Sequence, residues 1–272
     1  AKADAVVGVG GYVCTPMYLA ARKLNIPVII HEANAKPGLA NRVGAAHAAL
    51  VATAFPNTPI KNAHHVGMPM RAAIETLDKD SQKTGARQRL GLDTDLPTLV
   101  VTGGSLGAQS LNNAVREIYQ RLEDWGFQML HITGRNKALA DENGNLLTAP
   151  QYHQREFITS MEDVYAAADL MVVRSGAATV SEVAAVGVPA IFVPLPIGNG
   201  EQALNATSLV DAGASLLIND SEFDAAWFVN NIPTLMNDSQ RLEEMRKRSY
   251  QQGIRNAART MAQEILKVAQ HD

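Results

Sequence analysis

The sequence predicts an α/β protein with a doubly wound parallel sheet, and three observations support this. Short apolar, β-branched runs such as Leu170–Val173 alternate with segments at helical spacing, such as Ala177–Val186. Glycine stands where a strand passes into a helix or where a helix ends, as at Gly187. With 46% hydrophobic and 19% charged residues, the 272-residue chain can bury the core that this architecture needs.

Strands and helices alternate from the beginning of the chain. Short apolar runs predict strands at residues 5–7, 27–30 and 50–54. The glycine-rich loop Gly8–Tyr12 follows the first strand, and periodicity predicts helices at residues 15–24 and 39–46. His31 and Glu32 follow the second strand, where they either contribute to a site or pair with each other.

The rest of the chain repeats the pattern with more elements. Apolar runs predict strands at residues 98–102, 127–133, 155–158, 170–173, 190–195 and 214–218. Helices are expected at residues 109–122, 161–168, 177–186 and from 201 onwards. A helix at 222–231 should end ahead of Pro233, because proline has no N–H group to continue it. Residues 241–270 predict one long helix or a helix pair with Met261 and Ile265 on its apolar face.

A change in composition divides the chain into two domains. Residues 77–96 predict a linker, in which the polar run 78–83 is a solvated surface and a short helix at 84–90 enters the second domain. Residues 1–76 are assigned to the first domain, 97–250 to the second, and 251–272 to a C-terminal helix that packs back towards the first. Because the chain starts at Ala1 without methionine and enters a strand almost at once, we expect the first domain to be incomplete.

Charge and cysteine content exclude several classes of protein. The net charge of −3 and the isoelectric point near 6.2 argue against a nucleic-acid partner. Cys14 is the single cysteine, so no internal disulfide can form. No apolar run reaches the roughly 18–20 residues of a membrane helix, and we expect a soluble intracellular protein. His64 and His65 lack further ligands at a metal-binding spacing, so neither a metal nor a cofactor is expected.

Two strand-to-helix loops predict a binding site at the carboxyl edge of the second domain's sheet. The loop Gly103–Ala108 places Ser105 among glycines before a helix, where its hydroxyl and nearby N–H groups suit a phosphate. The loop Ser175–Ala178 offers N–H groups at another helix N-terminus, which suits a pyrophosphate. Further along that helix, Glu182 either accepts hydrogen bonds from a ribose diol or complements the helix dipole from an exposed position.

Seven motifs follow one another over almost the whole chain: Gly8–Tyr12, His31–Asn41 (HEANAKPGLAN), Gly67–Arg71, Gly103–Asn112 (GGSLGAQSLN), Phe157-Ile158, Arg174–Glu182 (RSGAATVSE) and Glu201–Ala206. Together they resemble the MurG family of peptidoglycan glycosyltransferases. Most are weak singly, whereas RSGAATVSE and GGSLGAQSLN together are specific. The resemblance implies a GT-B fold, in which two Rossmann-like domains face each other across a cleft and the second holds most of the donor.

The resemblance also implies a set of donor contacts. Ser105 and its loop would hold the donor phosphates, and Arg71 would pair with the pyrophosphate. Ile158 would lie against the uracil, Glu182 on the ribose hydroxyls and Gln202 on the sugar hydroxyls, where it would help to select N-acetylglucosamine. The remaining contacts would come from Asn34 in a cleft-facing loop and from residues that run along the donor: Ala177, Ala178, Thr179, Val180 and Ser181.

The sequence departs from the family pattern in three places. Ala33 stands where the family usually has glutamine, and Glu201 stands where many relatives have a first glutamine, so the sugar contacts can differ. The family's Gly-Gly-Thr-x-Gly-His segment, which carries the histidine usually proposed as general base, does not occur in this sequence. No catalytic base is therefore assigned, and for His31 a structural role is the alternative. We expect this chain to bind the donor but to be nearly inactive alone.

The resemblance implies an inverting transfer of N-acetylglucosamine from UDP-N-acetylglucosamine to undecaprenyl-pyrophosphoryl-N-acetylmuramoyl-pentapeptide, the step from lipid I to lipid II in peptidoglycan synthesis. A peripheral location on the cytoplasmic face of the bacterial plasma membrane follows. A helix N-terminus and an arginine can stabilise the departing β-phosphate without a metal. Two alternatives remain: a UDP-N-acetylglucosamine 2-epimerase of the same fold, which would form product from the donor alone, and a non-catalytic nucleotide-sugar-binding module.

Overall fold

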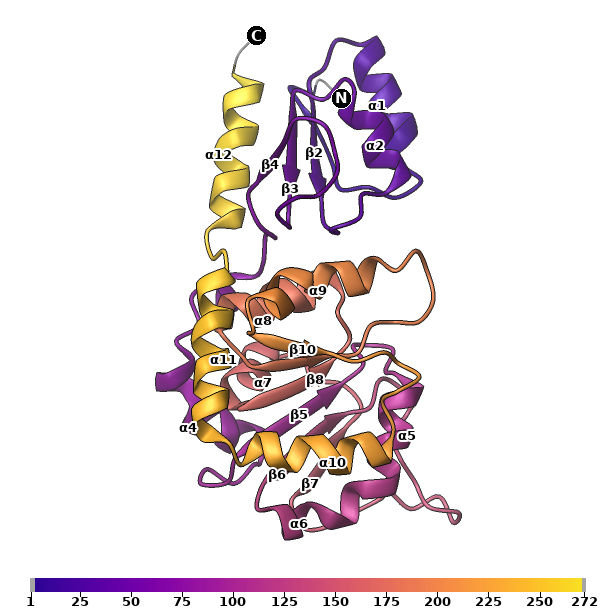
Figure 1. The fold of residues 1–272 in the computed structure, drawn as a ribbon. Helices are drawn as coiled ribbons and strands as arrows, with labels where there is room; N and C mark the ends of the chain where they lie inside the picture. The colour runs from indigo at the N-terminus through magenta and orange to yellow at the C-terminus, as the bar shows by residue number, and fades with distance from the viewer. Residues whose placement is uncertain (1–2, 271–272) are drawn as a thin grey trace. The chain divides into compact units, whose positions relative to one another are not determined.

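The computed structural model describes residues 3–270, which form two compact α/β units (Figure 1). Of the described residues, unit 1 comprises 3–71, 176–181 and 254–270, and unit 2 comprises 72–175 and 182–253. The division therefore passes through one helix, between Ser181 and Glu182. Residues 1, 2, 271 and 272, at the ends of the predicted first domain and C-terminal helix, lie outside the described residues.

Unit 1 is built on a parallel sheet with the strand order β1-β2-β3-β4. The strands are β1 (Val6–Gly8), β2 (Val28–Glu32), β3 (Leu50–Thr53) and β4 (Ala63–His65). The helices α1 (Cys14–Lys23) and α2 (Leu39–Ala45) pack together over one face, with Tyr18, Ile30 and Val51 in the core beneath them. A third helix, α12 (Ala257–Ala269), packs Met261 against Ile29 and Ala52.

Unit 2 is built on six parallel strands in the order β10-β9-β8-β5-β6-β7. They are β5 (Thr98–Thr102), β6 (Gln128–Ile132), β7 (Tyr152–Arg155), β8 (Leu170–Val173), β9 (Ala190–Phe192) and β10 (Ser215–Leu217). The chain runs outwards from β5 to β7, then returns to β8 and runs outwards in the other direction. This is the topology of a doubly wound sheet, in which the order reverses between β5 and β8.

The helices that accompany this sheet cover both of its faces (Figure 1). They are α3 (Ala72–Glu75), α4 (Lys79–Leu90), α5 (Gln109–Ile118), the 3-10 turn η1 (Tyr119–Arg121), α6 (Leu122–Trp125), α7 (Met161–Ala167), α8 (Ala177–Val186), α9 (Glu201–Asp211), α10 (Ala225–Met236) and α11 (Ser239–Gln252). One core cluster packs α5 and α10 against the sheet, with Leu111, Val115, Phe228 and Ile232 fully buried. The central strands are buried on both faces, which explains their continuous apolar sequences.

Strand β7 lies three residues earlier than the sequence predicts. Its register joins Met129 to Tyr152 and Ile132 to Arg155, so the predicted strand at residues 155–158 begins where β7 ends. β7 is an edge strand of the sheet and contains the polar residues His153 and Gln154. An edge strand is partly exposed and can therefore contain polar residues. A prediction based on apolar runs does not detect such a strand.

The predicted end of the helix at residues 222–231 was wrong. Asp224 caps the helix by accepting a hydrogen bond from the Trp227 N–H group at 2.7 Å, and α10 continues through Pro233 to Met236. The buried side chains of Ile232 and Leu235 hold this last turn against the core. Their burial offsets the hydrogen bond that proline cannot donate. Beyond it, α11 and α12 form the helix pair that was one of the two expectations for residues 241–270.

The polar run at residues 78–83 is part of a helix and not only a solvated surface. Asp78 caps α4 by accepting from the Ser81 N–H group at 3.3 Å, and Lys79 in the first turn is buried. Lys83 and Arg87 both pair with Asp169, at 2.5 and 2.6 Å. These ion pairs connect α4 to the segment that precedes β8. The composition of the polar run alone does not predict this connection.

Candidate functional site

The strand order of unit 2 predicts the position of a ligand-binding crevice. In open α/β sheets ligands bind outside the carboxyl ends of the strands where the order reverses, here β5 and β8. The glycine loop with Ser105 follows β5, and Arg174 and Ser175 follow β8. The fold therefore brings two of the motifs that the sequence singles out to the same edge of one sheet.

The glycine loop packs tightly against the segment after β6. A Cβ atom on Gly107, whose φ is +67°, would lie 2.0 Å from the carbonyl oxygen of Thr133, so no larger residue fits. Ser105 is exposed, and its carbonyl oxygen accepts a hydrogen bond from the Arg135 N–H group at 3.2 Å. The next helix, α5, has Ala108 at its N-cap and no side-chain cap. Its first N–H groups therefore suit an anionic ligand near Ser105.

Arg174 is tied into the structure by several hydrogen bonds. Its Nη1 atom donates to the carbonyl oxygens of Val193 and Pro194, both at 3.0 Å, and pairs with Asp220. Its Nη2 atom donates to the Ser110 hydroxyl at 3.1 Å. The Arg174 side chain is 12% exposed and that of Asp220 is 18% exposed. The cluster joins the ends of β8 and β9 to the first turn of α5 and to the segment after β10.

Glu182 is half-buried on α8 and has a defined partner. Its Oε2 atom accepts a hydrogen bond from the Tyr165 hydroxyl at 2.7 Å, and Tyr165 is itself buried in α7. Glu182 is therefore not in the exposed position that the alternative of a dipole-complementing carboxylate assumes. Ser175 is fully buried beneath this region, and its Oγ atom has no hydrogen-bond partner within the described part of the chain.

Gln202 and Ile158 follow two other strands of the same sheet. Gln202 lies in the first turn of α9, after β9, and its Oε1 atom accepts from the Leu195 N–H group at 3.0 Å. Glu201 accepts from the Asn199 N–H group at 2.9 Å, so it holds the loop before α9. Ile158 is half-buried and lies three residues beyond the end of β7. The carboxyl ends of parallel strands share one edge, and the predicted contacts from these strands therefore gather there.

In unit 1, β2 extends further than predicted and contains both His31 and Glu32. The two side chains do not pair with each other. His31 is buried, and its Nε2 atom forms a hydrogen bond with the carbonyl oxygen of Gly67 at 2.9 Å, which is a structural contact. Glu32 is buried too and accepts from the N–H groups of Asn34 and Gly38, both at 3.0 Å, and from Asn41 Nδ2 at 2.8 Å. Neighbouring residues in a strand point to opposite faces, which separates the two side chains.

The other predicted contacts belong to unit 1 as well. Asn34 is half-buried in the loop that Glu32 fixes, and Arg71 is exposed at the end of the segment 1–71. The first half of α8 supplies the remaining ones: Val180 is buried, Ala178 is exposed, and the half-buried residues are Ala177, Thr179 and Ser181.

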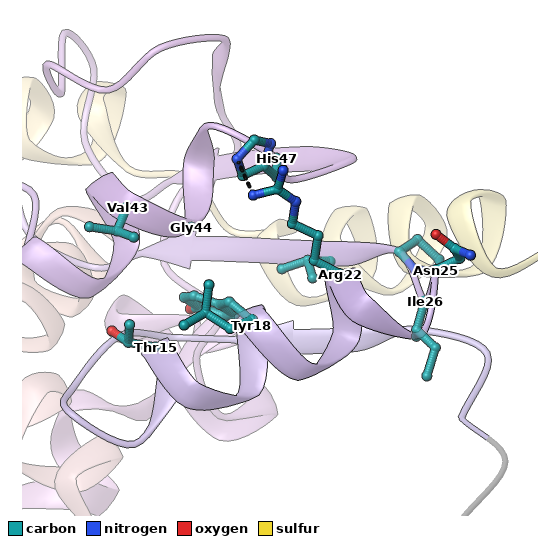
Figure 2. Close-up of a pocket in the computed structure, with 11 residues that line it drawn as sticks. Thr15, Tyr18, Arg22, Asn25, Ile26, Val43, Gly44 and His47 are labelled. Atoms are coloured by element: carbon teal, nitrogen blue, oxygen red, sulfur yellow. Dashed lines mark hydrogen bonds between the residues drawn. The ribbon is translucent and has the colours of Figure 1, made fainter.

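A cavity of about 400 Å³ opens between α1 and α2, and the sequence gives no signal for it. Figure 2 shows its lining, with the Arg22–His47 pair between Tyr18 and Val43 on one side and Asn25 and Ile26 on the other. The Nη1 atom of Arg22 lies 2.9 Å from the Nε2 atom of His47. Within residues 3–270, no helix is long and apolar enough to span a bilayer, and no group of three or more His, Cys, Asp or Glu side chains could hold a metal ion.

Comparison with known proteins decides the family. Residues 98–263 match the model of the Glycosyltransferase family 28 C-terminal domain, and residues 1–53 match that of the N-terminal domain. The chain is 56% identical over 266 residues to the UDP-N-acetylglucosamine–N-acetylmuramyl-(pentapeptide) pyrophosphoryl-undecaprenol N-acetylglucosamine transferase of Paenarthrobacter aurescens (strain TC1). The match covers 98% of this chain and 72% of that protein. The chain belongs to the MurG family of glycosyltransferases.

Solved structures agree with this assignment. The crystal structure of Acinetobacter baumannii MurG matches with a TM-score of 0.81 and 36% identity, over 98% of this chain and 74% of that one. The UDP-N-acetylglucosamine 2-epimerase of Neisseria meningitidis matches with a TM-score of 0.67 but only 17% identity, over 98% and 77% of the two chains. At that identity the likeness is one of fold. The predicted α/β GT-B class and the predicted glycosyltransferase are therefore confirmed through the MurG family.

Proposed function

We propose that this chain transfers N-acetylglucosamine from UDP-N-acetylglucosamine to an N-acetylmuramyl-pentapeptide carried on pyrophosphoryl-undecaprenol. The observation that carries the proposal is its 56% identity, over 98% of the chain, to a transferase named for this reaction. The epimerase alternative is supported by fold alone, because the solved epimerase shares only 17% identity. Transfer to a lipid-linked acceptor is therefore the function that the observations favour.

The donor is proposed to bind at the carboxyl edge of the sheet in unit 2. Support comes from the reversal of strand order between β5 and β8 and from the uncapped N-terminus of α5. Ser105 and the first N–H groups of α5 would hold the diphosphate and stabilise its charge as UDP departs. Glu182 would accept hydrogen bonds from the ribose hydroxyls, Ile158 would contact the uracil, and Gln202 would contact the sugar.

Asn34, Arg71 and the residues Ala177–Ser181 are proposed as further donor contacts on the strength of the family motifs alone. His31 is not proposed as the catalytic base, because its Nε2 atom is engaged with Gly67 and its side chain is buried. We also propose peripheral contact with the cytoplasmic face of the plasma membrane, since the acceptor in the relatives' name is attached to undecaprenol, a lipid.

Calorimetric titration with UDP-N-acetylglucosamine and UDP-glucose tests the donor site. Glu182→Gln keeps an acceptor for the Tyr165 hydroxyl but removes the charge, and we expect it to weaken donor binding about tenfold. Tyr165→Phe is the matched control, because it removes the other side of that hydrogen bond and leaves the carboxylate in place. Equal affinity of the Glu182→Gln variant and the unchanged chain would remove Glu182 from the site.

A transfer assay with radiolabelled donor and the lipid-linked acceptor tests the reaction. Labelled lipid product supports the proposal, and a new UDP-sugar formed without acceptor supports the epimerase instead. Failure to bind either UDP-sugar would contradict the proposal for this chain.

A further inference from the structure

Three segments at the carboxyl edge of unit 2 are locked together through their backbones. The Arg135 N–H group, after β6, donates to the carbonyl oxygen of Ser105, after β5, at 3.2 Å. On the other side, the Gly134 N–H group donates to the carbonyl oxygen of Glu156, after β7, at 3.1 Å. A Cβ atom on Gly134 would lie 2.4 Å from the nitrogen of Gly107. The segment after β6 therefore links the glycine loop to the segment that contains Phe157 and Ile158.

The Arg135 side chain lies over the ring of Phe157. Its Cζ atom is 4.0 Å from the ring centroid, a distance at which a guanidinium and an aromatic face attract each other. The neighbouring carboxylate of Glu156 accepts instead from the Asn136 N–H group at 3.0 Å. Within residues 3–270, Arg135 forms no ion pair. Both Arg135 and Phe157 are exposed. The planar, charged guanidinium of Arg135 is thus held at the carboxyl edge of the sheet in unit 2. One of its faces lies on Phe157, and the other face is available to a ligand.

We infer that Arg135 is a further donor-binding residue, which together with Phe157 forms a wall for the nucleobase of the donor. This inference rests on the proposed function. Arginine is planar and stacks on ring systems, so a pyrimidine can pack against the Arg135–Phe157 pair. The Arg135 N–H group is bonded to Ser105, which is proposed for the phosphates, and Arg135 lies three residues beyond β6. Phe157 precedes Ile158, which is proposed for the base. The pair therefore stands on the nucleoside side of the glycine loop.

Calorimetry of the whole chain with UDP and with UMP, at low and at high salt, tests the inference. We expect Arg135→Ala to weaken the binding of both nucleotides by a similar factor, about five- to tenfold, that persists at high salt. Arg135→Lys should restore only part of it, because lysine lacks the planar group. The double variant Arg135→Ala/Phe157→Ala should lose less than the product of the two single losses. Lys137→Ala, which removes an exposed charge from the same segment, is the control with unchanged affinity.

Two results overturn the inference while leaving the proposed function intact. One is unchanged affinity of Arg135→Ala for UDP, and the other is a loss that disappears at high salt or for UMP, which would mark a diphosphate contact. An unchanged chain that binds no UDP contradicts the proposed function and the inference with it. Thermal unfolding of each variant shows whether it folds, and the exposed position of Arg135 makes a folded variant the expected result.

Discussion

Asp220, which follows β10, accepts a hydrogen bond at 2.6 Å from the hydroxyl of Ser110 in the first turn of α5. The same carboxylate pairs with Arg174, whose guanidinium also binds backbone carbonyl groups after β9. One acidic side chain thus fixes the beginning of the helix that follows the glycine loop, although 110 residues separate it from Ser110 in the sequence. We therefore expect the proposed phosphate site to depend on this contact for its rigidity.

Asp220→Asn should destabilise unit 2 by about 2–3 kcal/mol, because it leaves the nearly buried charge of Arg174 without its counter-charge. We also expect weaker binding of UDP-N-acetylglucosamine, since the first turn of α5 loses its anchor. Urea denaturation and calorimetry measure the two effects. Glu222→Gln, an exposed carboxylate in the same segment, should change stability by less than about 0.5 kcal/mol. Equal stability of the two variants would show that the Arg174–Asp220 pair contributes little.

Gly107→Ala and Gly104→Ala form a matched pair within one loop. Both positions have positive φ, +67° and +83°, so alanine strains the backbone at either one by about 1 kcal/mol. At Gly107 the new Cβ would also meet the Thr133 carbonyl oxygen at 2.0 Å, whereas at Gly104 it has nothing within 4 Å. Gly107→Ala should therefore cost at least about 2 kcal/mol more and reduce donor affinity. Similar losses in the two variants would contradict the close approach of the loops.

Glu32→Gln should loosen the loop that contains Asn34. The buried carboxylate accepts hydrogen bonds from the N–H groups of Asn34, Gly38 and the Asn41 side chain. An amide can accept only through its one oxygen, while its NH₂ group faces donors. We expect a loss of about 2–3 kcal/mol in stability and faster hydrogen exchange in residues 33–38. The exposed Asp4 gives the control variant Asp4→Asn. Unchanged exchange in this loop would show that Glu32 does not organise it.

The sequence predicted the central elements well because they are buried on both faces. The strands 98–102 and 170–173 and the helix 177–186 have the predicted bounds, and β7 was displaced because its polar residues belong to an edge strand. Ser105 could be singled out because it lies in the glycine loop that follows a strand, and Glu182 because it is a carboxylate on the helix that follows another strand. The partners Asp220 and Tyr165 could not, since each meets its partner only through the fold, 110 residues from Ser110 and 17 from Glu182.

Lys79 shows most clearly what composition conceals. It lies in the polar run expected to be solvated, yet it is buried beside a cavity of about 320 Å³, and its Nζ atom donates to the Ala166 carbonyl oxygen at 3.3 Å. Burial lowers the pKa of Lys79 from 10.5 to about 8, although the nearby carboxylate of Asp169 acts in the opposite direction. In the unfolded chain Lys79 keeps its proton up to about its ordinary pKa. Between pH 8 and 10.5 the unfolded state therefore binds more protons than the folded state.

The free energy of unfolding should consequently rise with pH across this window. The contribution of Lys79 to this free energy is complete above pH 10.5 and is lost as pH falls through about 8. Lys79→Met removes this dependence. Urea denaturation measures the free energy of unfolding of the variant and of the unchanged chain. We expect the variant's value minus that of the unchanged chain to fall by up to about 3 kcal/mol from pH 8 to 10.5. Lys137→Met, at an exposed lysine, should differ from the unchanged chain by the same amount at every pH. If the difference in free energy of unfolding between Lys79→Met and the unchanged chain is also independent of pH, Lys79 keeps its proton in the folded protein. The attraction of Asp169 would then outweigh the effect of burial on the pKa of Lys79.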